Sequence, residues 1–247
     1  MNDVDTLERF LAGAHVGDAV FALRPDYRAL LLAVDGLVPG PSDQDSDALL
    51  QAAETSASQA LSKQPVDQLP HVAAWRDAYR AFGAKPQRTR NSVEALLRRA
   101  ESGLPRVNRL TDLYNAVSVR HQLPLGGEDL TRYVGAPQLI RATGTEPFHT
   151  TAGGAEVIDH PELGEVVWCD DAGVTCRRWN WRQARRTQLR NDTTTALFLF
   201  DALDPMTDEA LLAAADDLST HLLRLGPDVH IARRRLITTG ANLDEGD

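Results

Sequence analysis

The sequence predicts an α+β protein in which a mixed, largely antiparallel sheet packs against helices. Ala- and Leu-rich stretches repeat apolar residues at helical spacing, and short apolar runs bounded by Gly, Pro and Asp follow in the second half. With 247 residues and 43% hydrophobic content, the chain can bury a substantial core. We expect one domain over residues 1–238, with a helical element at 206–226 and a disordered tail at 239–247.

The first half reads as two short strands followed by helices. Pro and Gly separate these segments, and Asn91 with Glu94 three residues later resembles a capping box. The expected elements are strands at 19–23 and 29–34, a linker at 39–46, a helix that ends near Lys63, a break at 65–70, a helix at 71–82 that Gly83 closes, and a helix that ends before Gly103.

The second half turns from a helix to strands. Residues 107–121 have helical periodicity, residues 170–173 form a hairpin connection, and residues 208–225 form an amphipathic helix that Gly226-Pro227 ends. The strands are expected at 139–142, 155–158, 165–169, 174–178 and 196–200.

The helix at 107–121 carries an unusual polar face. At about 100° per residue, four short polar side chains fall within roughly a third of its circumference. They are Asn108, Asp112, Asn115 and Ser118, opposite Leu110, Leu113, Tyr114 and Val117. Solvated helix faces usually carry Lys, Glu and Arg, whereas short amides beside a carboxylate suit fixed hydrogen bonds. The face is therefore either solvated, or bonded to a neighbouring loop or a ligand.

Several protein classes lack support in this sequence. No run of eighteen apolar residues predicts a membrane-spanning helix, and the acidic N-terminus does not resemble a signal peptide. Cys169 and Cys176 are too few for a disulfide framework and match no zinc spacing. We expect a cytoplasmic protein that needs no metal or cofactor. The oligomeric state is open, with a monomer favoured.

The net charge of −9 is unevenly distributed. Residues 71–199 hold 18 basic and 14 acidic side chains, while both flanking segments are acidic. No acidic residue lies between Arg177 and Arg190, a segment with six arginines and with Trp179 and Trp181. Guanidinium groups contact phosphates and indole rings stack on bases. This segment is either a nucleic-acid docking face or a solvated loop with two buried tryptophans.

Familiar catalytic motifs are absent from the sequence. It has no P-loop, dinucleotide fingerprint, His-Glu-x-x-His or Gly-x-Ser-x-Gly motif. His121 ends the amide-bearing helix before a Gly126-Gly127 loop, and its position favours a structural role over catalysis. His149 is expected in a loop between Glu146 and Gly153-Gly154, from which it could reach a ligand.

Two blocks of sequence resemble a known family. The first is Lys85-Pro86, Arg88, residues 90–96, Leu104-Pro105, Asn108, Leu110, Asp112, Tyr114-Asn115, Ser118, Leu123-Pro124, Gly126-Gly127 and Asp129-Leu130. The second is residues 164–168, Gly173-Val174, residues 178–183 and Thr187. Together they are similar to the editing domain of the phenylalanyl-tRNA synthetase beta subunit, in its free-standing form. The resemblance covers residues 81–203, about half of the chain.

This resemblance implies a hydrolase that cleaves the ester between tRNA and a wrongly attached amino acid. In the synthetase domain, a glutamate near the end of the glycine-rich strand recognises the wrong side chain. Our alignment finds no glutamate among residues 182–186, where that residue is expected. The wall formed by residues 180–183 instead suggests a polar or non-protein amino acid, such as an arginine analogue.

An aminoacyl ester is an activated acyl group, so its hydrolysis needs a positioned water and donors for the oxyanion. The expected donors are the Asn180 and Gln183 side chains and N–H groups of Gly126 and Gly127, although glycine pairs also serve tight turns. The expected substrate-binding residues are Asn108, Asp112, Asn115, Ser118, His121, Glu146, His149 and Trp181. The expected tRNA-binding residues are Lys85, Arg88, Arg90, Arg182, Arg185 and Arg186.

Two functions compete at this point. The first is a trans-acting aminoacyl-tRNA deacylase. The second is a non-catalytic module that binds tRNA or a small ligand, since no activated nucleophile is evident.

Overall fold

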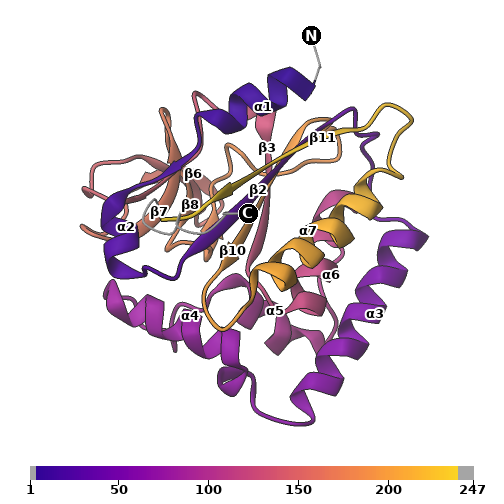
Figure 1. Ribbon diagram of the computed structural model, residues 1–247, viewed down its shortest axis with the longest axis horizontal. Helices are drawn as coiled ribbons and strands as arrows, with labels where there is room; N and C mark the ends of the chain where they lie inside the picture. Colours follow the sequence, from indigo (N-terminus) through magenta and orange to yellow (C-terminus); the bar gives the residue numbers. More distant parts are fainter. Residues whose placement is uncertain (1–3, 239–247) are drawn as a thin grey trace, which may run out of the picture.

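A four-stranded antiparallel sheet with the order β11-β2-β10-β3 forms the centre of the protein (Figure 1). The computed structural model describes residues 4–238. The four strands are β2 (Arg28–Asp35), β3 (Leu125–Asp129), β10 (Ala196–Ala202) and β11 (His230–Leu236). Both β2 and β10 are buried on both faces, which explains their nearly continuous apolar sequences.

Helices cover one face of this sheet. Phe198 and Phe200 of β10 pack with Leu110 and Val117 of α6 and with Leu218 of α7. A further helical layer packs against α6 from the side away from the sheet. The helices on the sheet are α6 (Arg109–His121) and α7 (Asp208–Leu222). The outer layer consists of α3 (Gln44–Leu61), α5 (Ser92–Ala100) and the short helix η1 (Val66–Gln68).

A second sheet packs on the other face. Leu197 and Leu199 of β10 share a core with Trp168 and Trp179 of this sheet. Its order is β1-β4-β7-β8-β9, antiparallel except for the parallel β1–β4 pair. Its strands are β1 (His15–Val16), β4 (Gln138–Arg141), β7 (Val166–Asp170), β8 (Gly173–Arg177) and β9 (Arg182–Gln183). The remaining elements are α1 (Val4–Ala12), α2 (Asp18–Leu23), α4 (Pro70–Ala81), η2 (Leu130–Arg132) and the hairpin of β5 (Phe148–Ala152) with β6 (Ala155–Asp159).

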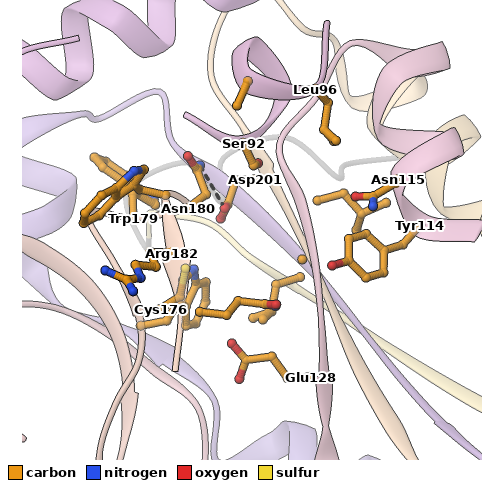
Figure 2. Close-up of a pocket in the computed structure, with 17 residues that line it drawn as sticks. Ser92, Leu96, Tyr114, Asn115, Glu128, Cys176, Trp179, Asn180, Arg182 and Asp201 are labelled. Carbon is orange, nitrogen blue, oxygen red and sulfur yellow. Dashed lines mark hydrogen bonds between the residues drawn. The ribbon is translucent and has the colours of Figure 1, made fainter. Parts of the chain in front are cut away.

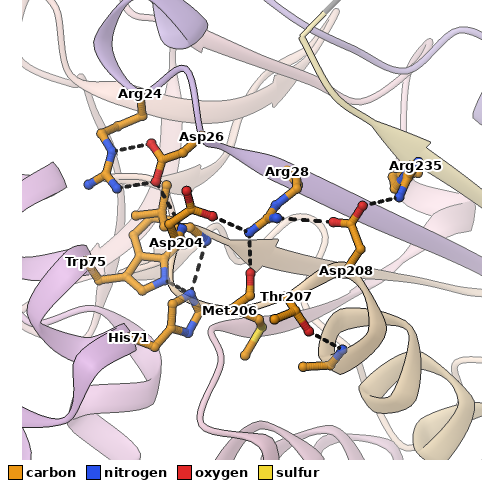
Figure 3. A network of polar contacts seen from close by, with 12 residues as sticks. Arg24, Asp26, Arg28, His71, Trp75, Asp204, Met206, Thr207, Asp208 and Arg235 are labelled. Carbon is orange, nitrogen blue, oxygen red and sulfur yellow. Dashed lines mark hydrogen bonds and ion pairs between the residues drawn. The ribbon is translucent and has the colours of Figure 1, made fainter. Parts of the chain in front are cut away.

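A polar network fastens the connection between β10 and α7 (Figure 3). The Arg28 guanidinium lies 3.2 Å from both the Asp204 and the Asp208 carboxylates. His71 of α4 accepts hydrogen bonds at Nε2 from the Trp75 indole (3.2 Å) and the Leu203 N–H (3.1 Å). The network therefore ties α4 to the residues that directly follow β10.

The α+β class and most elements agree with the sequence predictions. Asn108 caps α6 and Asn91 caps α5 by accepting the Thr111 and Glu94 N–H groups. The Glu94 carboxylate does not complete a capping box but accepts from Arg76 instead (2.7 Å). In the described residues, no helix has the length and apolar character needed to cross a membrane.

Three predictions about local structure were wrong. Residues 19–23 belong to the helix α2, which is too short to show a helical period in sequence. Gly126 and Gly127 lie within β3 rather than in a loop, and His149 lies within β5. The strand β11 was not predicted. The expected disordered tail lies outside the described residues.

Candidate active site

A cavity of about 250 Å³ lies between the two sheets, beside the first turn of α5 (Figure 2). Strands β3 and β10 supply one wall, and β7, β8 and the turn into β9 supply the other. Its lining is Ser92, Ala95, Leu96, Tyr114, Asn115, Leu125, Gly126, Glu128, Trp168, Cys176, Trp179, Asn180, Trp181, Arg182, Gln183, Leu199 and Asp201. Most of the surface that lines the cavity is apolar, so the polar side chains among these residues fix what it can bind.

The turn between β8 and β9 directs Asn180 into this cavity. Arg178 and Trp179 both have left-handed backbone conformations, with φ of 48° and 67°. Such conformations are costly for residues with side chains and persist only where the surroundings enforce them. The Glu165 carboxylate accepts the Arg178 N–H (3.0 Å), and the fully buried Trp179 anchors the turn in the core.

Asp201 and Asn180 belong to a series of hydrogen bonds in the cavity that begins and ends at tyrosine hydroxyls. The Tyr27 hydroxyl donates to Asp201 Oδ1 (2.6 Å), and Asn180 Nδ2 donates to Oδ2 (3.1 Å; Figure 2). The Tyr79 hydroxyl donates to Asn180 Oδ1 (2.9 Å). Both carboxylate oxygens of Asp201 are therefore satisfied. Burial raises its pKa to about 7, although the bonds from Tyr27 and Asn180 oppose that shift.

Glu128 is the second carboxyl group of the cavity, and it differs from Asp201. Its side chain is fully buried, and the Tyr133 hydroxyl donates to Oε2. Oε1 has no hydrogen-bond partner among residues 4–238. Burial raises the Glu128 pKa to about 7, although the nearby Tyr133, Thr187 and Thr175 hydroxyls oppose the shift. A buried acceptor without a well-directed donor is uncommon in folded proteins, and the nearby Thr175 and Thr187 hydroxyls have no partner in the described residues either.

Gln183 and the two glycines of β3 meet at the edge of the sheet. Gln183 Nε2 donates to the Gly127 carbonyl (2.8 Å). The Asp129 N–H bonds to the Thr187 carbonyl on the same edge, away from β10. Because hydrogen-bond directions alternate along a strand, the Gly127 N–H also faces this edge, and the Gly126 N–H faces β10. Of the two predicted glycine donors, only Gly127 is thus directed away from the sheet ladder.

The structure brings three further predicted residues to the cavity but leaves three members of the α6 face elsewhere. Asn115, Trp181 and Arg182 line the cavity with Asn180 and Gln183. Asn108, Asp112 and Ser118 are buried outside it. Their bonds go to Thr111, to Val107 and Ser46, and to Leu123. The polar face is therefore not solvated, and most of it braces the fold.

The other predicted ligand-binding residues also lie away from the cavity. His121 Nε2 contacts the Asp217 carboxylate of α7 at 2.9 Å. The Glu146 carboxylate accepts the N–H groups of the turn at residues 143–145. His149 lies on β5 and lines a second cavity.

The arginine-rich segment is only partly free to bind a partner. Arg177 is buried in a bidentate pair with Glu165, and Arg178 donates to Thr89. Arg186 pairs with Asp170 at 2.6 Å. Arg182, Arg185 and Arg190 are exposed. The Arg178–Thr89 contact places the loop with the exposed residues Lys85, Arg88 and Arg90 beside the turn that carries Arg182.

Sequence reasoning missed both carboxyl groups of the cavity. Asp201 interrupts the apolar run of β10, and an ionisable group inside a buried strand is costly unless it has a role. Glu128 directly follows the glycine pair, which was interpreted as a loop. The described residues contain no group of three or more His, Cys, Asp or Glu side chains placed to hold a metal ion.

Comparison with known proteins identifies the family. The family model described as "B3/4 domain" matches residues 74–224. The chain therefore belongs to the B3/4 domain family, which is the family of the phenylalanyl-tRNA synthetase beta subunit. Membership of this family is consistent with a tRNA-related function.

A solved structure from the phenylalanyl-tRNA synthetase beta subunit is among those similar to this chain. The crystal structure of an N-terminal fragment of the phenylalanyl-tRNA synthetase beta subunit from Pyrococcus horikoshii is similar, with 14% identity and a TM-score of 0.47. The match covers 95% of this chain and 54% of that chain, so this chain spans about half of that fragment. No curated protein matches.

Proposed function

We propose that this protein is a trans-acting aminoacyl-tRNA deacylase that hydrolyses the ester of mischarged tRNA. The observation that carries the proposal is the cavity between the sheets, in which the unpartnered Glu128 Oε1 lies in a mostly apolar enclosure. Such an enclosure suits an amino-acid side chain, and the family connects it to tRNA.

The chemistry needs only water and this chain's own donors. Water adds to the ester carbonyl carbon, and the tetrahedral intermediate collapses by breaking the bond to the terminal ribose oxygen. That oxygen leaves as the hydroxyl of tRNA, and the amino acid leaves as a free acid. Gln183 and the Gly127 N–H are the candidate donors to the oxyanion. Asn180, held between Tyr79 and Asp201, positions the wall beside them.

Glu128 favours a substrate whose side chain carries a hydrogen-bond donor. A site with a buried acceptor rejects analogues that cannot donate to it, because the acceptor would then stay unpaired. Asp201 also lines the cavity, which therefore holds two carboxyl groups and suits a polar or basic side chain. We therefore favour a non-protein amino acid of that type, such as an arginine analogue.

The tRNA body docks around the mouth of this cavity in our proposal. Lys85, Arg88 and Arg90 lie on the loop next to the Arg182 turn, and all four side chains are exposed. Phosphate contacts release counterions, so the affinity for tRNA should fall steeply as salt concentration rises.

The test is a panel of tRNAs, each charged with a different amino acid, incubated with catalytic amounts of the protein. Repeated release of one class of amino acid per protein molecule supports the deacylase. The variant Gln183→Ala should slow release by about 100-fold, as expected for the loss of one oxyanion donor. Binding of tRNA without release from any member of the panel contradicts the proposal and supports the non-catalytic module.

A further inference from the structure

A second cavity, of about 370 Å³, lies between the β5–β6 hairpin and the segment that follows β9. Three guanidinium groups line it, from Arg185, Arg186 and Arg190, and His149 of β5 joins them. Among the described lining residues, Glu156 is the only carboxylate. The cavity therefore carries a net positive charge and would attract an anion.

The three arginines differ in how much of their charge is available. Asp170 holds both terminal nitrogens of Arg186, at 2.9 and 2.6 Å, while its buried Nε has no partner within the described chain. Arg185 lies 3.6 Å from the exposed Glu156, which is too far for a hydrogen bond. Arg190 is exposed and forms no ion pair with another described residue. Arg185 and Arg190 can thus contact a ligand without breaking a strong internal bond.

The hairpin wall of this cavity also carries two exposed apolar side chains. Val157 and Ile158 of β6 line it, with 36% and 58% of their surfaces exposed. A purely ionic site would not need aliphatic side chains next to its cations. A sugar–phosphate chain presents both an anionic group and apolar faces of ribose and base, so it matches both walls.

The second cavity is joined to the candidate active site by one short segment. Arg182 and Gln183 line the central cavity, and Arg185, Arg186 and Arg190 line the second one. The Arg185 N–H donates to the His149 carbonyl (3.0 Å), which fixes the segment to the hairpin. Glu128 of the central cavity pairs with Gln188 of the same segment across a β-bridge. A ligand could therefore occupy both cavities across this segment.

We propose that this second cavity binds a backbone phosphate of the single-stranded 3′ end of tRNA while the attached amino acid occupies the central cavity. The inference rests on the proposed function for its choice of tRNA as the ligand. The site itself is defined by the β5–β6 hairpin and by the three arginines of the segment that follows β9. Arg185 and Arg190 contact the phosphate oxygens, and Arg186 adds positive charge beside them. Val157 and Ile158 contact the neighbouring ribose or base.

The experiment measures binding of a short single-stranded RNA that ends in CCA and carries no amino acid, using the full chain at several salt concentrations. The variant Arg185→Ala/Arg190→Ala should bind about tenfold or more weakly. Its logarithmic salt dependence should be shallower by about 1.4, or 0.7 for each lost phosphate contact. Lys63→Ala/Arg99→Ala removes the same charge from exposed positions on the α3 and α5 side and should bind like the unmodified protein.

A third variant separates a phosphate site from a structural role. Glu156→Gln removes the one carboxylate of the cavity and should strengthen RNA binding by about threefold, which a merely structural role would not do. A double arginine variant that binds RNA like the unmodified protein overturns the inference. Inorganic phosphate that displaces the RNA at an equal concentration also overturns it, because the cavity would then be a simple anion site.

These outcomes are distinguishable from failure of the proposed function, because the RNA carries no ester. Protein that binds the RNA through Arg185 and Arg190 but releases no amino acid from any charged tRNA contradicts only the deacylase. Protein that hydrolyses charged tRNA while the double variant still binds RNA normally contradicts only the second cavity.

Discussion

The buried Asp112 beside α6 finds its hydrogen-bond partners within the fold, whereas some polar atoms of the central cavity do not. Asp112 accepts the Val107 N–H (2.9 Å) and the Ser46 hydroxyl (3.1 Å). In the cavity, Glu128 Oε1 and Ser92 Oγ have no partner in the described part of the chain. Since buried polar groups are normally paired, the difference separates side chains that stabilise the fold from side chains left for a ligand.

The largest expected effect comes from changing Glu128, the cavity carboxyl group with an unpaired oxygen. Glu128→Gln keeps the shape and an acceptor for the Tyr133 hydroxyl but turns an N–H donor toward the ligand. We expect kcat/KM for the preferred aminoacyl-tRNA to fall about 1,000-fold, or about 4 kcal/mol, because a buried charged contact is lost. The free energy of unfolding above pH 7 should stay equal or rise, since the folded variant no longer has to hold an ionised Glu128 carboxylate in a buried position.

The control is Glu101→Gln, which changes an exposed carboxylate at the end of α5 and should leave kcat/KM unchanged. Steady-state kinetics and chemical denaturation of both variants measure the two effects. If Glu128→Gln lowers stability and leaves kcat/KM intact, the carboxyl group is structural and the comparison fails.

A change at the paired carboxylate, Asp112, should lower stability and leave kcat/KM unchanged. Asp112→Ala removes a buried carboxylate that accepts from the Val107 N–H and the Ser46 hydroxyl, so the free energy of unfolding should fall by about 2 kcal/mol. The kcat/KM of the protein that remains folded should not change, because Asp112 lies outside the cavity. Denaturant titration compares it with Asp192→Ala, an exposed control on the loop before β10. A selective loss of kcat/KM would instead place Asp112 in substrate binding.

Sequence reasoning was most successful where the reason for an element is local. Asn91 and Asn108 were recognisable as helix starts because capping is a contact over three residues. Gly127 was misinterpreted because the contacts that require a glycine at this position come from residues far away in the sequence. A Cβ there would lie 2.8 Å from both Leu189 and Tyr114, so close packing between layers selects glycine within a strand.

The same distinction explains the missed site residues and the missed strand. Glu128 and Asp201 are far apart in sequence and line one cavity only because β3 pairs with β10. The strand β11 carries three consecutive arginines, which indicate no buried strand. It lies at the edge of its sheet, where charged side chains are tolerated and protect against further pairing.

A fall in pH should change the stability contributions of His71 and of the cavity carboxyl groups in opposite directions. His71 Nδ1 donates to the Gln122 carbonyl (2.9 Å), and its Nε2 accepts two hydrogen bonds, so the folded protein holds the neutral ring. Burial lowers the His71 pKa to about 4, with Arg28 and Arg24 contributing to the shift. As pH falls from about 6.5 to 4, the unfolded chain binds a proton that the folded chain excludes. His71 therefore removes up to about 3 kcal/mol of stability in that range.

Glu128 and Asp201 act in the opposite direction. Their pKa values of about 7 mean that the folded protein binds protons that the unfolded chain has lost, so their contribution to stability rises as pH falls from 7 toward 4. Denaturant titrations of His71→Gln and of the unmodified protein should give a stability difference that shrinks by about 3 kcal/mol between pH 7 and pH 4. A difference that does not depend on pH contradicts the neutral buried His71.

The smallest expected effect concerns Cys176, the one thiol that lines the cavity among the described residues. Its side chain is buried, and burial together with the charges of Glu128 and Asp201 raises its pKa well above the ordinary value. A thiol must ionise to attack an ester, so Cys176 is a poor nucleophile despite its position. Cys176→Ala and Cys169→Ala should each retain kcat within about threefold, as replacement of a non-reacting side chain leaves the transition state unchanged. Rapid quench with labelled aminoacyl-tRNA should trap no acyl-enzyme, and chelator should not slow the reaction. A trapped thioester that disappears in Cys176→Ala would replace direct attack by water with covalent catalysis.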